Sequence, residues 1–248
     1  MLLTALVGYL DGMLEPWRFK DYAPNGLQVE GRAEVQRVIC GVTASQALID
    51  EALRQKADAI LVHHGYFWKG EDSRVVGLKK RRLQALLSND ISLLAYHLPL
   101  DAHPLVGNNA QLAEVLDLRV DGQGGEQDLL WHGKLALQMT AGAWCEDVSR
   151  RLGRQALLLG DAHKPIRRVA WCTGGAQDFF DAAIAMGVDA FLTGEVSEKN
   201  QHMAMESGCV FVAAGHHATE RFGIKALGRC VKDDFGIEVA FVDLENPV

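Results

Sequence analysis

The sequence has no long hydrophobic run, no excess of positive charge and no closely spaced cysteines, and each absence excludes a class of protein. No apolar run reaches the roughly 18 residues that a membrane-spanning helix requires, so we expect a soluble protein. The 25 basic residues stand against 32 acidic ones, and the net charge of -7 argues against binding to nucleic acid or to an anionic membrane. The five cysteines lack Cys-x-x-Cys spacing, which indicates reduced core thiols and a cytoplasmic protein.

Two further absences concern the organisation of the chain. The apolar start at residues 1–7 has neither a cationic region nor a small-residue cleavage site, so we expect the first helix of the fold and no signal peptide. No tract rich in serine, proline or glycine separates the halves of the 248-residue chain, which argues against a flexible linker. The apolar content of 48% excludes disorder and is ample for a buried core.

The sequence does contain a segment that occurs twice. When Arg37 is aligned with Arg168, an offset of 131 residues also pairs Gln46 with Gln177. Further identical pairs at this offset are Asp50 with Asp181, Ala52 with Ala183, Asp58-Ala59 with Asp189-Ala190, and Leu61 with Leu192. Each copy has the pattern strand, helix, strand, which predicts parallel strands covered by helices. We therefore expect an α/β fold of two interlocked, internally repeated lobes with mainly parallel sheets.

The repeat also predicts the boundaries of these lobes. Residues 1–120 would form the first α/β lobe and residues 166–248 the second. Residues 121–165 would form a connector packed on both lobes, with a strand at 135–139, a helix around 148–152 and a strand near 157.

The third strand of each copy is followed by a histidine and a carboxylate four residues apart. Here the offset falls to 119, so that His97 and Asp101 match His216 and Glu220. The second strand of the first copy ends in His63-His64. Because functional groups in parallel sheets gather beyond the carboxyl ends of the strands, we expect these six side chains to meet in one site between the lobes.

Four histidines and two carboxylates are a donor set typical of Zn, Mn, Fe or Ni, whereas Ca and Mg prefer oxygen ligands. Six ligands are too many for one catalytic zinc, and they suit two divalent ions about 3.5–4 Å apart. Taken singly, each motif has a plainer interpretation, because a His-His pair is more often a partly exposed turn and His-x-x-x-Glu a surface pair on a helix. Recurrence of the motif in both copies favours metal binding.

Other residues near the expected site are weaker candidates. Glu195 takes the place of His64 in the second copy, so we expect it to face the same cleft, as a catalytic general base or as a hydrogen-bond anchor. Gly174-Gly175 precedes a helix and either binds a phosphate or allows close packing. His217 either orients a metal ligand or faces solvent, and solvent is the expected surrounding of His103. We expect surface positions for His132, His163 and His202.

Several motifs together resemble those of one known family. They are DYAPNGLQVEG at residues 21–31, VHHGYFWKG at 62–70, HLPLDAHP at 97–104, TGEVSE at 193–198 and AGHHATER at 214–221. In combination they are similar to the Ngg-interacting-factor-three-like family, also labelled GTP cyclohydrolase 1 type 2 homologues, and especially to its short bacterial YbgI-type members. The resemblance covers nearly the whole chain.

The resemblance implies a dinuclear metal centre with five ligands, namely His63, His64, Asp101, His216 and Glu220. Glu220 would be the bridge, and His97 would lie close to the metals. The resemblance also implies a homohexameric ring, a trimer of dimers, whose metal sites face an internal cavity. The activity that it implies is metal-dependent hydrolysis of a nucleotide or similar small phosphorylated molecule, such as opening of the imidazole ring of GTP.

Two other function classes stay open. The protein would be a non-catalytic metal-binding scaffold or interaction protein if the ions only join its halves. A ring that encircles DNA is the third possibility, and the acidic charge balance argues against it.

Overall fold

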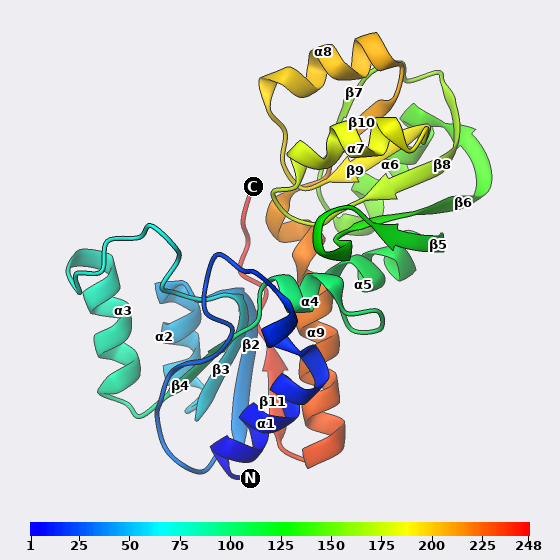
Figure 1. Ribbon diagram of the computed structural model, residues 1–248. Helices are drawn as coiled ribbons and strands as arrows, with labels where there is room; N and C mark the ends of the chain where they lie inside the picture. The colour runs from blue at the N-terminus through cyan, green and yellow to red at the C-terminus, as the bar shows by residue number, and fades with distance from the viewer. The chain divides into compact units, whose positions relative to one another are not determined.

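The computed structural model describes residues 1–248, and the chain divides into two compact units (Figure 1). One unit consists of residues 1–107 and 223–245, and the other of residues 108–222 and 246–248. This division differs from the predicted boundaries at 120 and 165. The segment predicted as a connector belongs to the second unit because its strands pair within that unit's sheet, and the chain later returns to the first unit for its last strand.

The first unit contains a five-stranded sheet in the order β1-β4-β3-β2-β11. Its strands are β1 (Gly26–Val29), β2 (Arg37–Thr43), β3 (Ala59–His64), β4 (Ser92–Ala95) and β11 (Glu238–Phe241). The β1–β4 pairing is antiparallel and the other pairings are parallel, as predicted. The helices are α1 (Leu3–Leu14), η1 (Pro16–Arg18), α2 (Gln46–Arg54), α3 (Gly77–Leu87), α4 (Leu98–Ala102) and the later part of α9 (His216–Phe235).

Alternating side chains of the central strands pack on opposite faces of this sheet. Val38, Cys40 and Leu61 belong to a core with α1 and α9, whereas Ile39 and Ile60 belong to a core with α2 and α3. Because both faces are covered, β3 is buried at every position from Ala59 to His63, as is typical of a parallel strand. This burial carries the end of β3 into the protein interior.

The second unit contains a six-stranded sheet in the order β5-β6-β8-β9-β10-β7. Its strands are β5 (Leu118–Gly124), β6 (Leu130–Thr140), β7 (Leu157–Leu159), β8 (Pro165–Trp171), β9 (Ala190–Thr193) and β10 (Val210–Ala213). Only β8–β9 and β9–β10 pair in parallel. The prediction of mainly parallel sheets is therefore wrong for this unit, because the segment predicted as a connector adds β5, β6 and β7 in the antiparallel sense.

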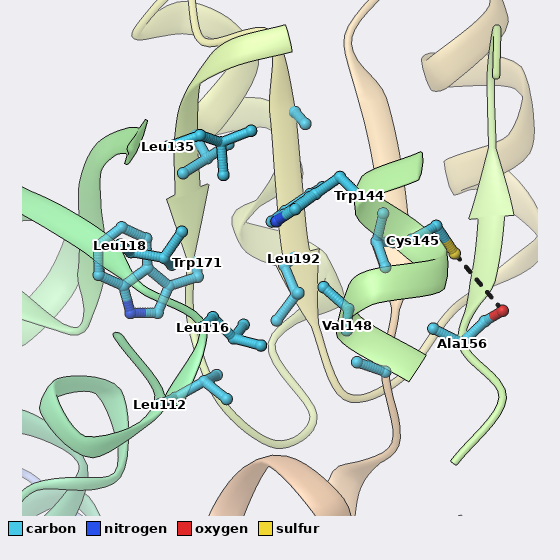
Figure 2. Close-up of a cluster of buried hydrophobic side chains, with 14 of the residues drawn as sticks. Leu112, Leu116, Leu118, Leu135, Trp144, Cys145, Val148, Ala156, Trp171 and Leu192 are labelled. Carbon is cyan, nitrogen blue, oxygen red and sulfur yellow. Dashed lines mark hydrogen bonds between the residues drawn. The ribbon is translucent and has the colours of Figure 1, made fainter. Parts of the chain in front are cut away.

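The helices of the second unit are α5 (Asn108–Val115), η2 (Glu126–Asp128), α6 (Ala141–Leu152), η3 (Gln177–Phe179), α7 (Phe180–Ala185), α8 (Glu198–Ser207) and the start of α9. Figure 2 shows part of the core of this unit, in which Trp144 and Val148 of α6 lie near Leu192 of β9. The helix α6 begins where the hydroxyl of Thr140 accepts a hydrogen bond from the backbone N–H of Ala143 at 3.3 Å.

Both units contain the order of elements that the repeat predicts. The first has β2, α2, β3, α3 and β4, and the second has β8, α7, β9, α8 and β10, with the three strands parallel in each case. The five cysteines form no disulfide, and burial raises the pKa of the Cys40 thiol to about 12. None of the helices combines the length and the apolar character that crossing a bilayer requires.

Candidate metal centre

His63 and His64 end β3, and hydrogen bonds orient both rings. The His63 side chain is fully buried, and its Nδ1 lies 2.9 Å from the carbonyl oxygen of Tyr96. A carbonyl can only accept, so Nδ1 of His63 donates its proton and Nε2 carries the lone pair. That Nε2 lies 3.5 Å from Oδ1 of Asp101 in α4. His64 Nδ1 lies 3.1 Å from the hydroxyl oxygen of Thr43.

His97 follows β4 and is held by two residues of the turn before β1. Its Nδ1 lies 2.7 Å from Oδ1 of Asp21, and its backbone N–H donates to Oδ1 of Asn25 at 2.7 Å. Asp21 also accepts hydrogen bonds from the backbone N–H of Leu98 and from the Asn25 side chain. Burial works to raise the pKa of Asp21, but His97 and these donors outweigh it and lower the pKa to about 2. Asp21 is therefore an ionised carboxylate that fixes the His97 ring.

These residues form one group of possible metal ligands. One ring nitrogen from each of His63, His64 and His97 lies within 4.8 Å of the others, and Asp101 joins through His63. We call these four residues the first-unit cluster. Imidazole and carboxylate donors fit a divalent transition metal such as zinc, whose bonds to nitrogen are about 2.0–2.1 Å long. All four candidate ligands that were predicted in this part of the chain are thus brought together.

His216 and Glu220 form a corresponding group at the start of α9, which we call the second-unit cluster. His216 Nε2 lies 3.2 Å from Oε2 of Glu220, whose carboxylate is buried one helical turn later. On the other side of the ring, His216 Nδ1 lies 2.6 Å from Oε1 of Glu195. Burial works to lower the pKa of His216, but the two carboxylates outweigh it and raise the pKa to about 9. The contact to His216 supports the interpretation of Glu195 as a hydrogen-bond anchor.

Gly174 and Gly175 leave room for these carboxylates. A Cβ atom on Gly174 would lie 2.0 Å from Oε1 of Glu220 and 3.1 Å from Nε2 of His216, and its φ of +71° already disfavours other residues. A Cβ on Gly175 would lie 3.4 Å from the carboxyl carbon of Glu195. Of the two interpretations of this pair, the contacts favour close packing, since carboxylates would repel a phosphate.

The remaining histidines lie outside the two clusters. His163 and His202 are exposed, as predicted. His132 on β6 is half-buried against Gly122 and thus less exposed than predicted. His103 is half-buried and does not face solvent freely, because its Nδ1 accepts hydrogen bonds from the backbone N–H groups of Leu105 and Val106. It holds the turn after α4, and burial lowers its pKa.

Sequence reasoning from the repeat missed the role of Asp21. The residue lies 76 positions before its partner His97 and has no equivalent in the second copy. Its only signal was membership of the motif at residues 21–31. The backbone N–H of His217, whose role was left open, donates to the carbonyl oxygen of Val248.

Comparisons with known proteins agree with these motifs. The model of the family Duf34/NIF3 (NGG1p interacting factor 3) matches residues 1–247. A Pseudomonas aeruginosa protein named GTP cyclohydrolase 1 type 2 homolog is 57% identical over 248 residues, which are 99% of this chain and 98% of that protein. Two solved structures cover all of this chain and are fully covered by it. Protein ybgI, described as of unknown function, has a TM-score of 0.97 at 51% identity, and TTHA1606 from Thermus thermophilus has 0.90 at 34%.

Proposed function

Because the chain belongs to the Duf34/NIF3 family, we propose that it is a hydrolase that depends on two divalent metal ions, with the residues of the two clusters as ligands. Its substrate is a nucleotide or a similar small phosphorylated molecule. The name GTP cyclohydrolase 1 type 2 homolog, which several relatives carry, supports a nucleotide as substrate. The homohexameric ring implied by the family resemblance belongs to the same proposal, and light scattering of the purified protein tests it.

The observation that carries the metal proposal is the orientation of the histidines. Nδ1 of His63, His97 and His216 each lies within 2.9 Å of an oxygen acceptor, respectively Tyr96 carbonyl, Asp21 and Glu195. Histidines that bind metals usually donate one ring N–H in this way, which fixes the ring and directs the other nitrogen toward the metal. The same arrangement at three histidines is a stronger indication than their spacing in the sequence.

The number and charge of the donors support two ions rather than one. Four candidate ligands come from the first-unit cluster and two from the second-unit cluster, whereas one catalytic zinc usually takes about three protein ligands. Two divalent ions and the carboxylates of Asp101 and Glu220 leave a positive charge on the ions and their direct ligands, which favours an anionic substrate at the ions themselves. When bound, the ions would polarise the bond to be cleaved and activate a water molecule.

Glu195 is the proposed general base. One of its oxygens is engaged by His216, while its side chain remains 36% exposed and thus accessible to water. A carboxylate held in one orientation beside a ligand can take the proton that an attacking water loses.

A non-catalytic metal-binding scaffold is the second candidate, and burial favours it. His63 is fully buried and Glu220 is 2% exposed, as expected for ligands of a closed structural site. The two candidates differ in turnover, not in metal content.

The test is Glu220→Gln, with metal analysis of the purified protein and hydrolysis of a nucleotide panel with added Mn or Zn. We expect about two ions per chain in the unmodified protein, and loss of both metal and turnover in the variant. Glu198→Gln is the matched control, because Glu198 also pairs with a histidine four residues away, His202 at 2.9 Å, but on an exposed helix face. Turnover that is independent of metal or unchanged in Glu220→Gln would sink the hydrolase, and bound metal without turnover would favour the scaffold.

A further inference from the structure

The first unit has a hollow of about 590 Å³ that is lined in part by Asp21 and Asn25, the two residues that hold His97. Its walls come from η1, from the turn before β1 and from the loop after β3. Its lining residues include Trp17, Asp21, Tyr22, Asn25, Phe67 and Lys69. The volume falls within the range of about 300–1,000 Å³ that is usual for pockets that bind small molecules.

The exposed aromatic residues of the protein gather at this hollow. Trp17, Tyr22 and Phe67 are 68%, 60% and 37% exposed, and they are the exposed aromatic side chains of the chain. A single exposed apolar side chain needs no explanation, but three aromatic ones around one concavity indicate a binding surface.

One residue in the wall of the hollow, Phe67, has an unfavourable backbone conformation. Phe67 has a φ of +66°, in the left-handed region that residues with a Cβ rarely adopt. The backbone N–H of Lys69 donates to the carbonyl oxygen of Tyr22 at 2.6 Å, which joins the two loops. Such strain clusters at ligand sites, where the surrounding structure over-determines the conformation.

The hollow shares two wall residues with the first-unit cluster. Asp21 and Asn25 line it, and the same two side chains hold the ring and the backbone N–H of His97. The loop that carries Phe67 and Lys69 also follows directly on His63-His64. A molecule seated in the hollow therefore lies next to the residues that orient the proposed metal ligands.

The chemistry of the lining points to a planar ring that carries an anion. Aromatic faces stack on heterocyclic bases, and the exposed ammonium group of Lys69 can meet a phosphate. The Asp21 carboxylate on the same wall is anionic and faces His97, whose Nδ1 lies 2.7 Å from its Oδ1, so the phosphate is placed at Lys69 and not at Asp21.

We propose that this hollow binds the base of a nucleotide, stacked against Trp17, Tyr22 and Phe67, with the phosphate at Lys69. This inference rests on the proposed function, because it names the class of substrate that the neighbouring metal ligands would act on. It also separates recognition from chemistry, since the base is held by side chains that bind no metal.

Calorimetry with guanosine 5′-monophosphate and ribose 5-phosphate tests the proposal on metal-loaded and on chelator-treated protein. We expect the nucleotide to bind at least about tenfold more tightly than the ribose phosphate in both states, and Trp17→Ala to remove this preference. Lys69→Ala should weaken both ligands. The control Leu137→Ala removes a 76% exposed side chain from β6 of the other unit and should change neither affinity.

Three outcomes would overturn the proposal. The first is equal affinity for the two ligands, and the second is an unchanged preference in Trp17→Ala. The third is a change in the molar mass of Trp17→Ala, measured by light scattering, without a change in affinity. That outcome would make the hollow a contact between subunits. If Glu220→Gln abolishes hydrolysis but keeps the preference for the nucleotide, the result supports binding of the base in the hollow. A base preference in a protein that hydrolyses no nucleotide would contradict the proposed function alone.

Discussion

The two units orient equivalent histidines with carboxylates from unrelated positions. In the first unit Asp21 precedes the sheet and lies 2.7 Å from Nδ1 of His97, whereas in the second unit Glu195 follows β9 and lies 2.6 Å from Nδ1 of His216. His97 and His216 are equivalent in the repeat, but their carboxylate partners are not. In both units a carboxylate therefore orients the histidine ring, although the two carboxylates come from different places in the chain.

Away from the candidate site, the same hydrogen bonds recur at equivalent positions. Asp58 accepts hydrogen bonds from the backbone N–H groups of Gln36 and Arg37, and Asp189 accepts them from residues 167 and 168, all between 2.8 and 2.9 Å. The guanidinium of Arg37 donates to the carbonyl of Gln55, and the guanidinium of residue 168 to that of residue 186. The corresponding residues in the two units lie 131 positions apart, which is the offset at which the two segments were aligned.

The units thus share these backbone contacts and differ in the residues beside their candidate metal ligands. Thr43 contacts His64 in the first unit, but the equivalent position in the second is Gly174, packed against Glu220. Substitutions at these positions test which of the differences affect stability and metal binding.

The largest effect is expected from Gly174→Ala. A Cβ at this position combines a left-handed φ with an approach of 2.0 Å to Glu220 Oε1, so the buried carboxylate must move. We expect a loss of about 2–4 kcal/mol in the free energy of unfolding, together with loss of bound metal. Urea unfolding and metal analysis measure the two effects.

Gly153→Ala is the matched control for that substitution. Gly153 ends α6 with a φ of +67°, but nothing lies within 4 Å of a Cβ there. The unfavourable φ alone should lower the free energy of unfolding by about 1 kcal/mol and leave the metal content unchanged. Equal losses of stability in the two variants would mean that glycine is needed at position 174 only for its positive φ, and not for the space that it leaves to Glu220.

A smaller effect is expected from removing the charge of the two anchoring carboxylates. Glu195→Gln should lower metal affinity about tenfold, because His216 loses a charged partner. Asp21→Asn should lower it about 100-fold, since Asp21 also accepts hydrogen bonds from Leu98 and Asn25 and so positions the start of α4. Competition with a chelator measures both affinities.

The relative size of the two losses of metal affinity tests how the two units differ in anchoring their histidines. A larger loss in Glu195→Gln than in Asp21→Asn would contradict the expected order, because the hydrogen bonds that Asp21 accepts from Leu98 and Asn25 would then add nothing to metal affinity. Unchanged metal affinity in Glu195→Gln, combined with lost turnover, would instead leave Glu195 the role of general base alone.

Local sequence signals were sufficient to predict the central strands and the residues of each cluster. The apolar runs that became β2, β3, β9 and β10 are short, bounded by turns and buried on both faces, so their pattern needs no distant information. His97 and Asp101 fall close together because both follow the same strand end. The corresponding step from β10 to His216 and Glu220 is equally local.

The rest depended on contacts between distant parts of the chain. The antiparallel placement of β5, β6 and β7 follows from pairings such as Trp131 with Trp171, which a pattern within one strand does not encode. Membership of α9 in both units has the same cause, since its Ile224 and Leu227 pack with α1. Asp21 is likewise recognisable only once His97 stands next to it.

A smaller loss of stability than in Gly174→Ala, with no loss of metal, is expected at the paired aspartates, where the units are most alike. Asp58→Ala should lower the free energy of unfolding by about 2 kcal/mol, because Asp58 is 8% exposed and its loss leaves two backbone N–H groups without their acceptor. It also removes the ion pair with Arg32, whose guanidinium keeps the carbonyl oxygens of Asn89 and Asp90 as acceptors. Asp189→Ala should cost about 1 kcal/mol, because the carboxylate is more exposed and accepts from the two backbone groups alone. Hydrogen exchange assigns each loss to one unit, at the amides of β2 or of β8. If Asp189→Ala lowers stability as much as Asp58→Ala, the contact between Asp58 and Arg32 contributes nothing. The two aspartates would then be equivalent in energy as well as in the geometry of their hydrogen bonds.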